Sequence, residues 1–200
     1  MVVAGTVFEK VAPALKIMNH ALASGGLTSC ANKQESSSAT TSEPAPVTPT
    51  ITDANIAAIV VAANQVDIEA GQLAKTKSQN AQVKAFADQM INEHSGVNAK
   101  ATELVTRLNV APEDNDTSRQ LLADGTAKRG QLAVLTGADF DRAYVDNEVA
   151  YHEAVLSAMD NTLIPGAQNA ELKALITGVR PTFVAHLDHA KQLQSSLSPQ

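Results

Sequence analysis

The sequence has few of the residues that recognise large partners or cross-link small folds. Its 200 residues include one cysteine and no tryptophan, and only 3% of the side chains are aromatic. A single cysteine excludes an intramolecular disulfide. Lysine and arginine form no run and the formal net charge is -6, so the chain lacks the basic surface that nucleic acid requires. We therefore expect no nucleic-acid partner.

Long apolar runs and catalytic motifs are also missing. No stretch of eighteen or more uninterrupted apolar residues is present, so any link to a membrane would have to be an anchor. The chain contains no glycine-rich phosphate loop, no Gly-x-Ser-x-Gly elbow and no Cys-x-x-Cys pair. These absences predict a protein that is not an enzyme.

Alanine, leucine and valine carry most of the apolar content, within a hydrophobic share of 44%. This mixture, with so few aromatic side chains, suits helices better than sheets. Two hundred residues are enough for one compact domain with its own core and some unfolded sequence besides. We therefore predict one all-α domain.

The first thirty residues resemble the export signal of a bacterial lipoprotein. The segment 27–30 reads Leu-Thr-Ser-Cys, and in a lipobox a small residue precedes a cysteine that is lipidated and becomes the mature N-terminus. Residues 1–29 would then be a signal peptide, although Lys16 and Asn19 interrupt its apolar stretch. Lipidation of Cys30 is the prediction, and a free cysteine is the alternative.

A linker follows the cysteine. Twelve of the twenty residues from 33 to 52 are Ser, Thr or Pro, a composition that buries too little apolar surface to order itself. Residues 30–52 are therefore predicted to be a disordered tether. With Ala31 after Cys30, the resemblance to lipoproteins implies the periplasmic side of the outer membrane, with the membrane as a partner through the lipid anchor.

From residue 53 to 195, apolar residues recur at alternating steps of three and four, which places them on one side of a helix. Thr52 or Asp53 is the expected N-cap of the first helix. The turn between the first two helices is short, which makes them antiparallel. Pro181 should kink the last helix. The four predicted stripes are Ile56–Leu73, Val83–Leu108, Phe140–Met159 and Leu172–Leu193.

The second and third stripes are joined by a long connection. It contains a marginal helix from Ser118 to Leu135, weakened by Gly125 and Gly130. If this segment runs back along the bundle, the second and third helices are parallel; otherwise the bundle is simply up and down. We favour the first arrangement, because neighbours in an up-down bundle are usually joined by two to eight residues.

Four segments also carry a resemblance to a known family: AANQVDIEAGQLA, VKAFADQMINEHS, ADFDRAYVDNEVAYHEAVL and RPTFVAHLDHAKQL. They resemble a ferritin-like bacterial envelope family of unknown function, whose members are often labelled as outer membrane proteins. The resemblance covers residues 53–193. It implies a ferritin-like four-helix bundle with a short extra helix in the long connection, and an envelope location, but no reaction. Glu93 stands where that family usually has aspartate.

The candidate site consists of five residues on the predicted inward faces. With a rise of about 1.5 Å per residue and the second and third helices parallel, all five fall in a band about two turns deep. A buried imidazole needs a hydrogen-bond partner or a metal, because an unpaired one costs on the order of 1 to 3 kcal/mol. The five residues are His94, Glu148, His152, His186 and Glu69.

Two interpretations of this band remain open. A di-iron site of the ferritin type would need Glu-x-x-His on two helices. The chain instead has Ile91, Val149 and Phe183 three residues before its histidines. We therefore favour a buried polar network that specifies helix pairing, with no cofactor. Binding of iron, copper or zinc is the alternative. His189 lies off the stripe and should be solvated.

The sequence thus favours a non-enzymatic, lipid-anchored envelope bundle with a structural, binding or stress-protection role. A ferritin-like protein that binds or oxidises a transition metal is the second hypothesis. The third is a helical module that binds a protein partner, which would require a large exposed apolar patch. The sequence names no such partner.

Overall fold

The computed structural model describes residues 51–197, and this part of the chain contains helices and no strand. The predicted signal peptide lies outside the described residues, as does the predicted tether up to residue 50. None of the described helices has a stretch that combines the length and the apolar character needed to cross a membrane. The helices are α2 (Asp53–Lys77), α3 (Ala81–Arg107), α4 (Asp116–Ala133), α5 (Gly137–Ala158), the π-helical η2 (Met159–Leu163), α6 (Ile164–Gly166) and α7 (Ala170–Leu197).

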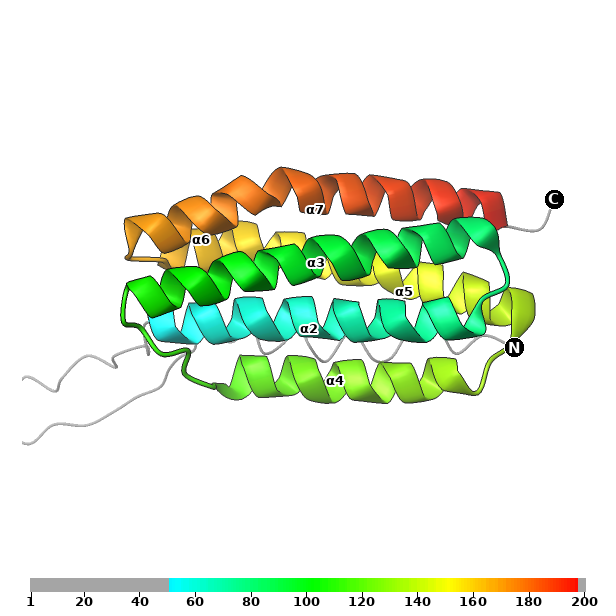
Figure 1. Ribbon diagram of the computed structural model, residues 1–200, viewed down its shortest axis with the longest axis horizontal. Coiled ribbons are helices and arrows are strands. Elements are labelled where there is room, and N and C mark those ends of the chain that lie inside the picture. The colour runs from blue at the N-terminus through cyan, green and yellow to red at the C-terminus, as the bar shows by residue number, and fades with distance from the viewer. Residues whose placement is uncertain (1–50, 198–200) are drawn as a thin grey trace, which may run out of the picture.

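Four long helices pack around a common core, and α4 lies outside them against α2 (Figure 1). Helix α2 packs on α3 and α5, and α7 packs on α3 and α5. Helix α3 is antiparallel to α2, and α4 then runs back along α2, so that α3 and α5 point the same way (Figure 1). The long connection therefore crosses the bundle, in the arrangement that its length favours.

The extra helix α4 is eighteen residues long and lies within two residues of the segment Ser118–Leu135 that was predicted to be a marginal helix. Asn115 caps its start, since its side chain accepts a hydrogen bond from the backbone of Ser118. Gly125 does not simply weaken it. A Cβ at this position would lie 2.7 Å from Cγ2 of Val66, so glycine is what lets α4 approach α2 closely.

The start of α2 revises the predicted boundary of the tether. Thr52 is the N-cap, and it forms a capping box with Asn55. Ile51 packs against the apolar core at the same end of the bundle. Both residues therefore belong to the folded domain, because their side chains close the first turn of α2 and cover apolar surface beneath it.

The ends of α5 and α7 also depart from regular geometry. Helix α5 continues into the π-helical turn Met159–Leu163, and Pro165 and Gly166 follow, close to the predicted end of the third helix. Helix α7 continues through Pro181 without a break in its assignment, and its axis bends near the middle in Figure 1. The bend is the expected effect of a proline, which removes one backbone hydrogen bond.

Two apolar clusters fill the core, one at each end of the bundle. The first surrounds Phe86, Met90 and Tyr144, and the second surrounds Ile59, Leu156 and Ile176. Between them, each of the four long helices places at least one buried titratable side chain. The core is therefore apolar at both ends and titratable in the middle.

Candidate metal centre

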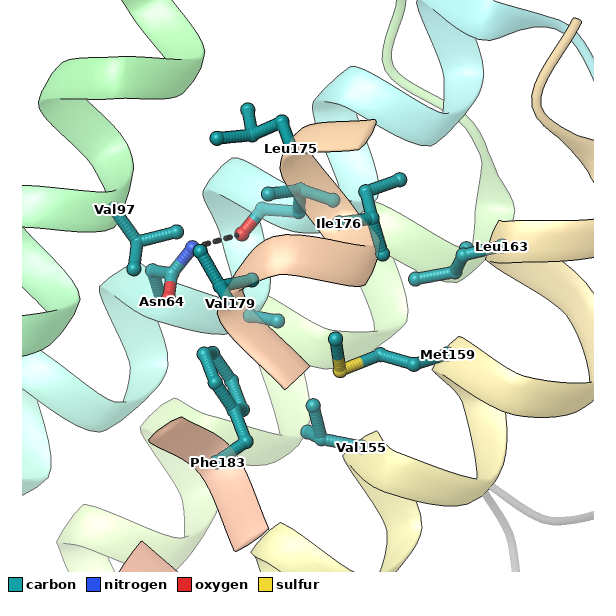
Figure 2. A pocket seen from close by; sticks show the side chains of 11 residues that line it. Asn64, Val97, Val155, Met159, Leu163, Leu175, Ile176, Val179 and Phe183 are labelled. Atoms are coloured by element: carbon teal, nitrogen blue, oxygen red, sulfur yellow. Dashed lines mark hydrogen bonds between the residues drawn. The ribbon is translucent and has the colours of Figure 1, made fainter. Parts of the chain in front are cut away.

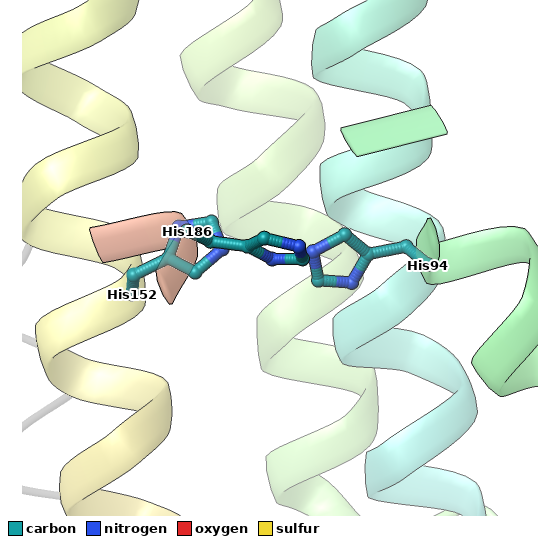
Figure 3. A group of neighbouring side chains, drawn as sticks. All are labelled: His94, His152 and His186. Carbon is teal, nitrogen blue, oxygen red and sulfur yellow. The ribbon is translucent and has the colours of Figure 1, made fainter. Parts of the chain in front are cut away.

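Five titratable side chains meet in the middle of the bundle, and each is at most 1% exposed. We call this set the polar cluster. Helices α2, α3 and α7 each supply one residue and α5 supplies two. Figure 3 shows the three imidazole rings approaching one another between the helices. The cluster consists of Asp67, His94, Glu148, His152 and His186.

Helical spacing explains why these side chains face inward. His94 lies one turn after the buried Met90, and His186 lies one turn before the buried Ala190, so each continues an apolar stripe. Glu148 and His152 are four residues apart on α5 and share a face. The same periodicity that buries the apolar clusters therefore buries the polar cluster between them.

One nitrogen of His94 is held by an amide whose orientation is fixed. The Nδ2 group of Asn64 donates a hydrogen bond to the backbone carbonyl of Val60 at 2.8 Å. Its Oδ1 atom is therefore the acceptor that faces Nδ1 of His94, at 2.7 Å. It follows that Nδ1 of His94 carries the proton and that its Nε2 atom, with a lone pair, faces the cluster.

The other two histidines are held in a similar way. Nδ1 of His152 lies 3.0 Å from the backbone carbonyl of Glu148, which can only accept a hydrogen bond. Nε2 of His186 lies 2.8 Å from the carboxylate of Glu93, whose side chain is 40% exposed. Partial burial raises the pKa of Glu93, but the hydrogen bonds with His186 and Gln89 and the electrostatic interaction with His186 together outweigh it and lower the pKa overall. Each ring thus has one nitrogen fixed and the other free.

The free nitrogens face one another and Asp67. Nε2 of His94 lies 3.2 Å from Oδ2 of Asp67, and Nε2 of His152 lies 3.5 Å from the same oxygen. Neither nitrogen has a hydrogen-bond partner among the described residues, and the same is true of Nδ1 of His186. The ligand atoms of the three histidines lie within 4.8 Å of one another. A bare nitrogen and an ionised carboxylate oxygen are both acceptors, so this contact needs either a metal ion between them or a proton retained on the carboxyl group.

Burial keeps the imidazoles of His94 and His152 neutral. Burial, helped by the neighbouring His186, lowers the pKa of His94 to about 3. Burial likewise lowers the pKa of His152 to about 4, against the opposing effect of the Asp67 carboxylate. Both rings are therefore neutral at pH 7, with lone pairs available to a metal.

Burial shifts the pKa values of the two carboxyl groups of the cluster upward, in the opposite direction to those of the imidazoles of His94 and His152. Burial raises the pKa of Asp67. Burial also raises the pKa of Glu148 well above its usual value, and the nearby Asp67 carboxylate raises it further. Like charges so close together in a low-dielectric core cannot both ionise. Without a metal, the pair therefore retains a proton near neutral pH.

The geometry suits one ion rather than two. His94, His152 and His186 form one possible ligand group, and Asp67, Glu148 and His152 form another. His152 belongs to both, and its Nδ1 atom already donates to a backbone carbonyl. Only its Nε2 atom remains to bind a metal, so the two groups describe one overlapping site.

The structure brings together four of the five residues expected at the site and leaves out Glu69. The Glu69 carboxylate is 31% exposed and forms an ion pair with Arg129 of α4 at 2.5 Å. Asp67, two residues earlier, takes the position on α2 that faces the histidines. Sequence reasoning missed it, although Asn64-x-x-Asp67 is a polar pair one turn apart in a strongly apolar helix.

Residues outside the cluster agree with their predicted roles. His189 is exposed and its Nδ1 atom lies 2.9 Å from Oε1 of Gln89. The aromatic residues Phe86, Phe140, Tyr144, Tyr151 and Phe183 are all buried in the core. Phe183 contacts the cluster directly, since its ring centroid lies 4.8 Å from that of His94.

Comparison with known proteins identifies a family but no function. The family model described as "Domain of unknown function (DUF4142)" matches residues 36–193. No curated protein and no solved structure matches the chain at a significant level. The geometry of the polar cluster is therefore the available basis for assigning a function.

Proposed function

Because the chain belongs to the DUF4142 family, whose description assigns no function, we propose a function from the site itself. The bundle binds one divalent transition-metal ion in its core. The ligands are three imidazole nitrogens and one carboxylate oxygen, with the carboxyl group of Glu148 beside them. The four ligand residues are His94, His152, His186 and Asp67.

The observation that carries this proposal is the orientation of the imidazoles. Each has an outer nitrogen held by an oxygen acceptor and an inner nitrogen directed at the cluster. Metal-binding histidines have this arrangement, because the outer hydrogen bond fixes the tautomer and orients the ring. In a purely structural network the inner nitrogens would need donors, and each unpaired buried group costs about 1 to 3 kcal/mol. A single metal ion would give all three inner nitrogens a partner, and this supports the metal site over the polar network favoured from sequence alone.

The donor set indicates the class of metal. Imidazole suits zinc, copper, iron and nickel, whereas magnesium and calcium prefer sites made of oxygen alone. Loading would displace the proton that the Asp67–Glu148 pair retains, so binding releases protons and tightens as pH rises. No Glu-x-x-His pattern surrounds these histidines. We therefore propose a ferritin-like relationship only on the basis of the connection that crosses the bundle, because the metal ligands do not follow the ferritin pattern.

Titration with Co²⁺ tests the proposal. We expect metal-free, untagged protein to bind one equivalent of Co²⁺ and to develop the visible absorption bands of a low-symmetry cobalt site. His189→Ala is the matched control, because this exposed histidine lies on the same helix as His186 and takes no part in the cluster. It should bind the same single equivalent. Failure of the parent protein to bind, or loss of binding in the control, would refute the assignment.

We also propose that the bundle is held at the cell envelope by lipid on Cys30. The support is the Leu-Thr-Ser-Cys pattern at residues 27–30 and the Ser/Thr/Pro-rich segment after it. In the native host, Cys30→Ser should move the protein from the membrane fraction to the soluble fraction. Membrane association that survives this substitution would contradict the anchor.

The two other functions considered from the sequence have less support. A partner-binding module needs a large exposed apolar patch. Within residues 51–197, the large apolar side chains that are exposed are Leu122 and Val134. A structural or stress-protection role stays a prediction, and it is compatible with metal binding.

A further inference from the structure

A small pocket lies beside the polar cluster, among α2, α3, α5, η2 and α7. Its volume is about 30 Å³. One water molecule requires roughly 10 to 15 Å³ on this measure, so the pocket has room for a molecule slightly larger than water. Figure 2 shows Val97, Val155, Ile176 and Phe183 directed toward this space from three different helices.

The walls of the pocket offer nothing that a polar molecule could bind. All the lining side chains are apolar except that of Asn64. Its amide nitrogen donates to the carbonyl of Val60, as the dashed line in Figure 2 shows, and its oxygen accepts from His94. A buried water needs two to four polar partners. The pocket therefore favours an apolar occupant.

A single aromatic ring stands between this pocket and the imidazoles. Phe183 lines the pocket, and its centroid lies 4.8 Å from the ring of His94 and 6.0 Å from that of His152. The centroid of His186 is 5.8 Å away. A molecule in the pocket would therefore be separated from the cluster by the thickness of one side chain.

We propose that this pocket binds a small apolar molecule of two or three atoms, the class to which dioxygen belongs, next to the metal centre. The importance of that position rests on the proposed metal function, but occupancy of the pocket does not, because none of the four proposed ligand residues lines it. Phe183 is a positioning residue, since it touches both the pocket and the histidines.

Xenon is the first probe, because it is apolar and of suitable size. We expect xenon under pressure to occupy this pocket in metal-free protein, as seen in xenon-derivatised crystals and by the ¹²⁹Xe chemical shift. Dioxygen is the second probe. Under oxygen pressure, the methyl signals of Val97, Val155 and Ile176 should show the largest paramagnetic relaxation enhancement.

A larger side chain that fills the pocket should abolish both xenon binding and the relaxation enhancement by dioxygen. Ala63→Leu places a larger side chain at a lining position, and Ala150→Leu is the control, made at an equally half-buried alanine that does not line the pocket. Val179→Phe fills the pocket from α7 if Ala63→Leu fails to fold. No xenon in the parent, or undiminished binding in the filled variant, would overturn the proposal. Co²⁺ titration of the same variants keeps the two proposals separate, since Ala63→Leu should still bind one equivalent.

Discussion

Adding Zn²⁺ at about a hundred times its dissociation constant should raise the free energy of unfolding by roughly 2.7 kcal/mol, and His152→Ala should eliminate this gain. The reason is mass action, since the ligands converge only in the folded chain. His152 is the best single residue to remove, because its Nε2 atom belongs to both possible ligand groups. Thermal and denaturant unfolding, each with and without Zn²⁺, measure the effect.

The same substitution has a second effect that does not depend on metal. It removes a fully buried side chain from contact with Asp67 and Glu148, so metal-free His152→Ala should lose about 1 to 3 kcal/mol. His189→Ala should change neither quantity by more than about 0.5 kcal/mol, as expected for an exposed side chain. If Zn²⁺ and chelator leave the parent protein equally stable, the polar-network interpretation is right and the metal proposal is wrong.

Asp67→Asn should make the metal-free protein more stable while it abolishes metal binding. Oδ2 of Asp67 faces two bare nitrogens at 3.2 and 3.5 Å. An asparagine amide can donate a hydrogen bond there and carries no charge to bury. We expect a gain of roughly 1 to 3 kcal/mol without metal, together with the loss of Co²⁺ and Zn²⁺ binding.

The stability gained in metal-free Asp67→Asn should depend on pH in a defined direction. The pKa of Asp67 is raised in the folded state. The folded parent therefore holds its proton more tightly than the unfolded chain, and it loses stability as pH rises from about 4 through the folded pKa. Asparagine does not titrate, so the difference between variant and parent should widen by at most about 1.4 kcal/mol per pH unit.

Glu69→Gln is the matched control for Asp67→Asn. It makes the same carboxylate-to-amide change two residues away on α2, at a partly exposed side chain paired with Arg129. It should leave metal binding intact and change stability by less than about 1 kcal/mol. If Asp67→Asn is instead destabilised without metal, Asp67 acts as a structural acceptor and the orientation argument fails.

Much of the architecture could be predicted from the spacing of apolar residues. His94 and His186 lie on the apolar stripes of α3 and α7, because each of these helices buries one continuous face. The length of the second connection indicated that it crosses the bundle. The π-helical turn at Met159–Leu163 could not be predicted, since no proline or glycine marks its start.

The ligand on α2 was misjudged for a physical reason. This helix is covered by α3, α4 and α5, so its buried residues do not form one narrow stripe. The position of Glu69 along the bundle axis was close to that of the histidines. This position does not determine the side of the helix to which the side chain points. At about 100° per residue, Asp67 points roughly 200° away from Glu69, toward the core. Glu69 points toward α4 and pairs with Arg129.

The contact between Glu93 and His186 has a consequence for proton exchange between the core and the solvent. One nitrogen of this ring touches a carboxylate that is 40% exposed, and the other faces the interior. An imidazole can take up a proton on one side and release it on the other. Because the proposed metal would occupy the inner nitrogen, His186 can pass a proton between the interior and Glu93 only while the site holds no metal.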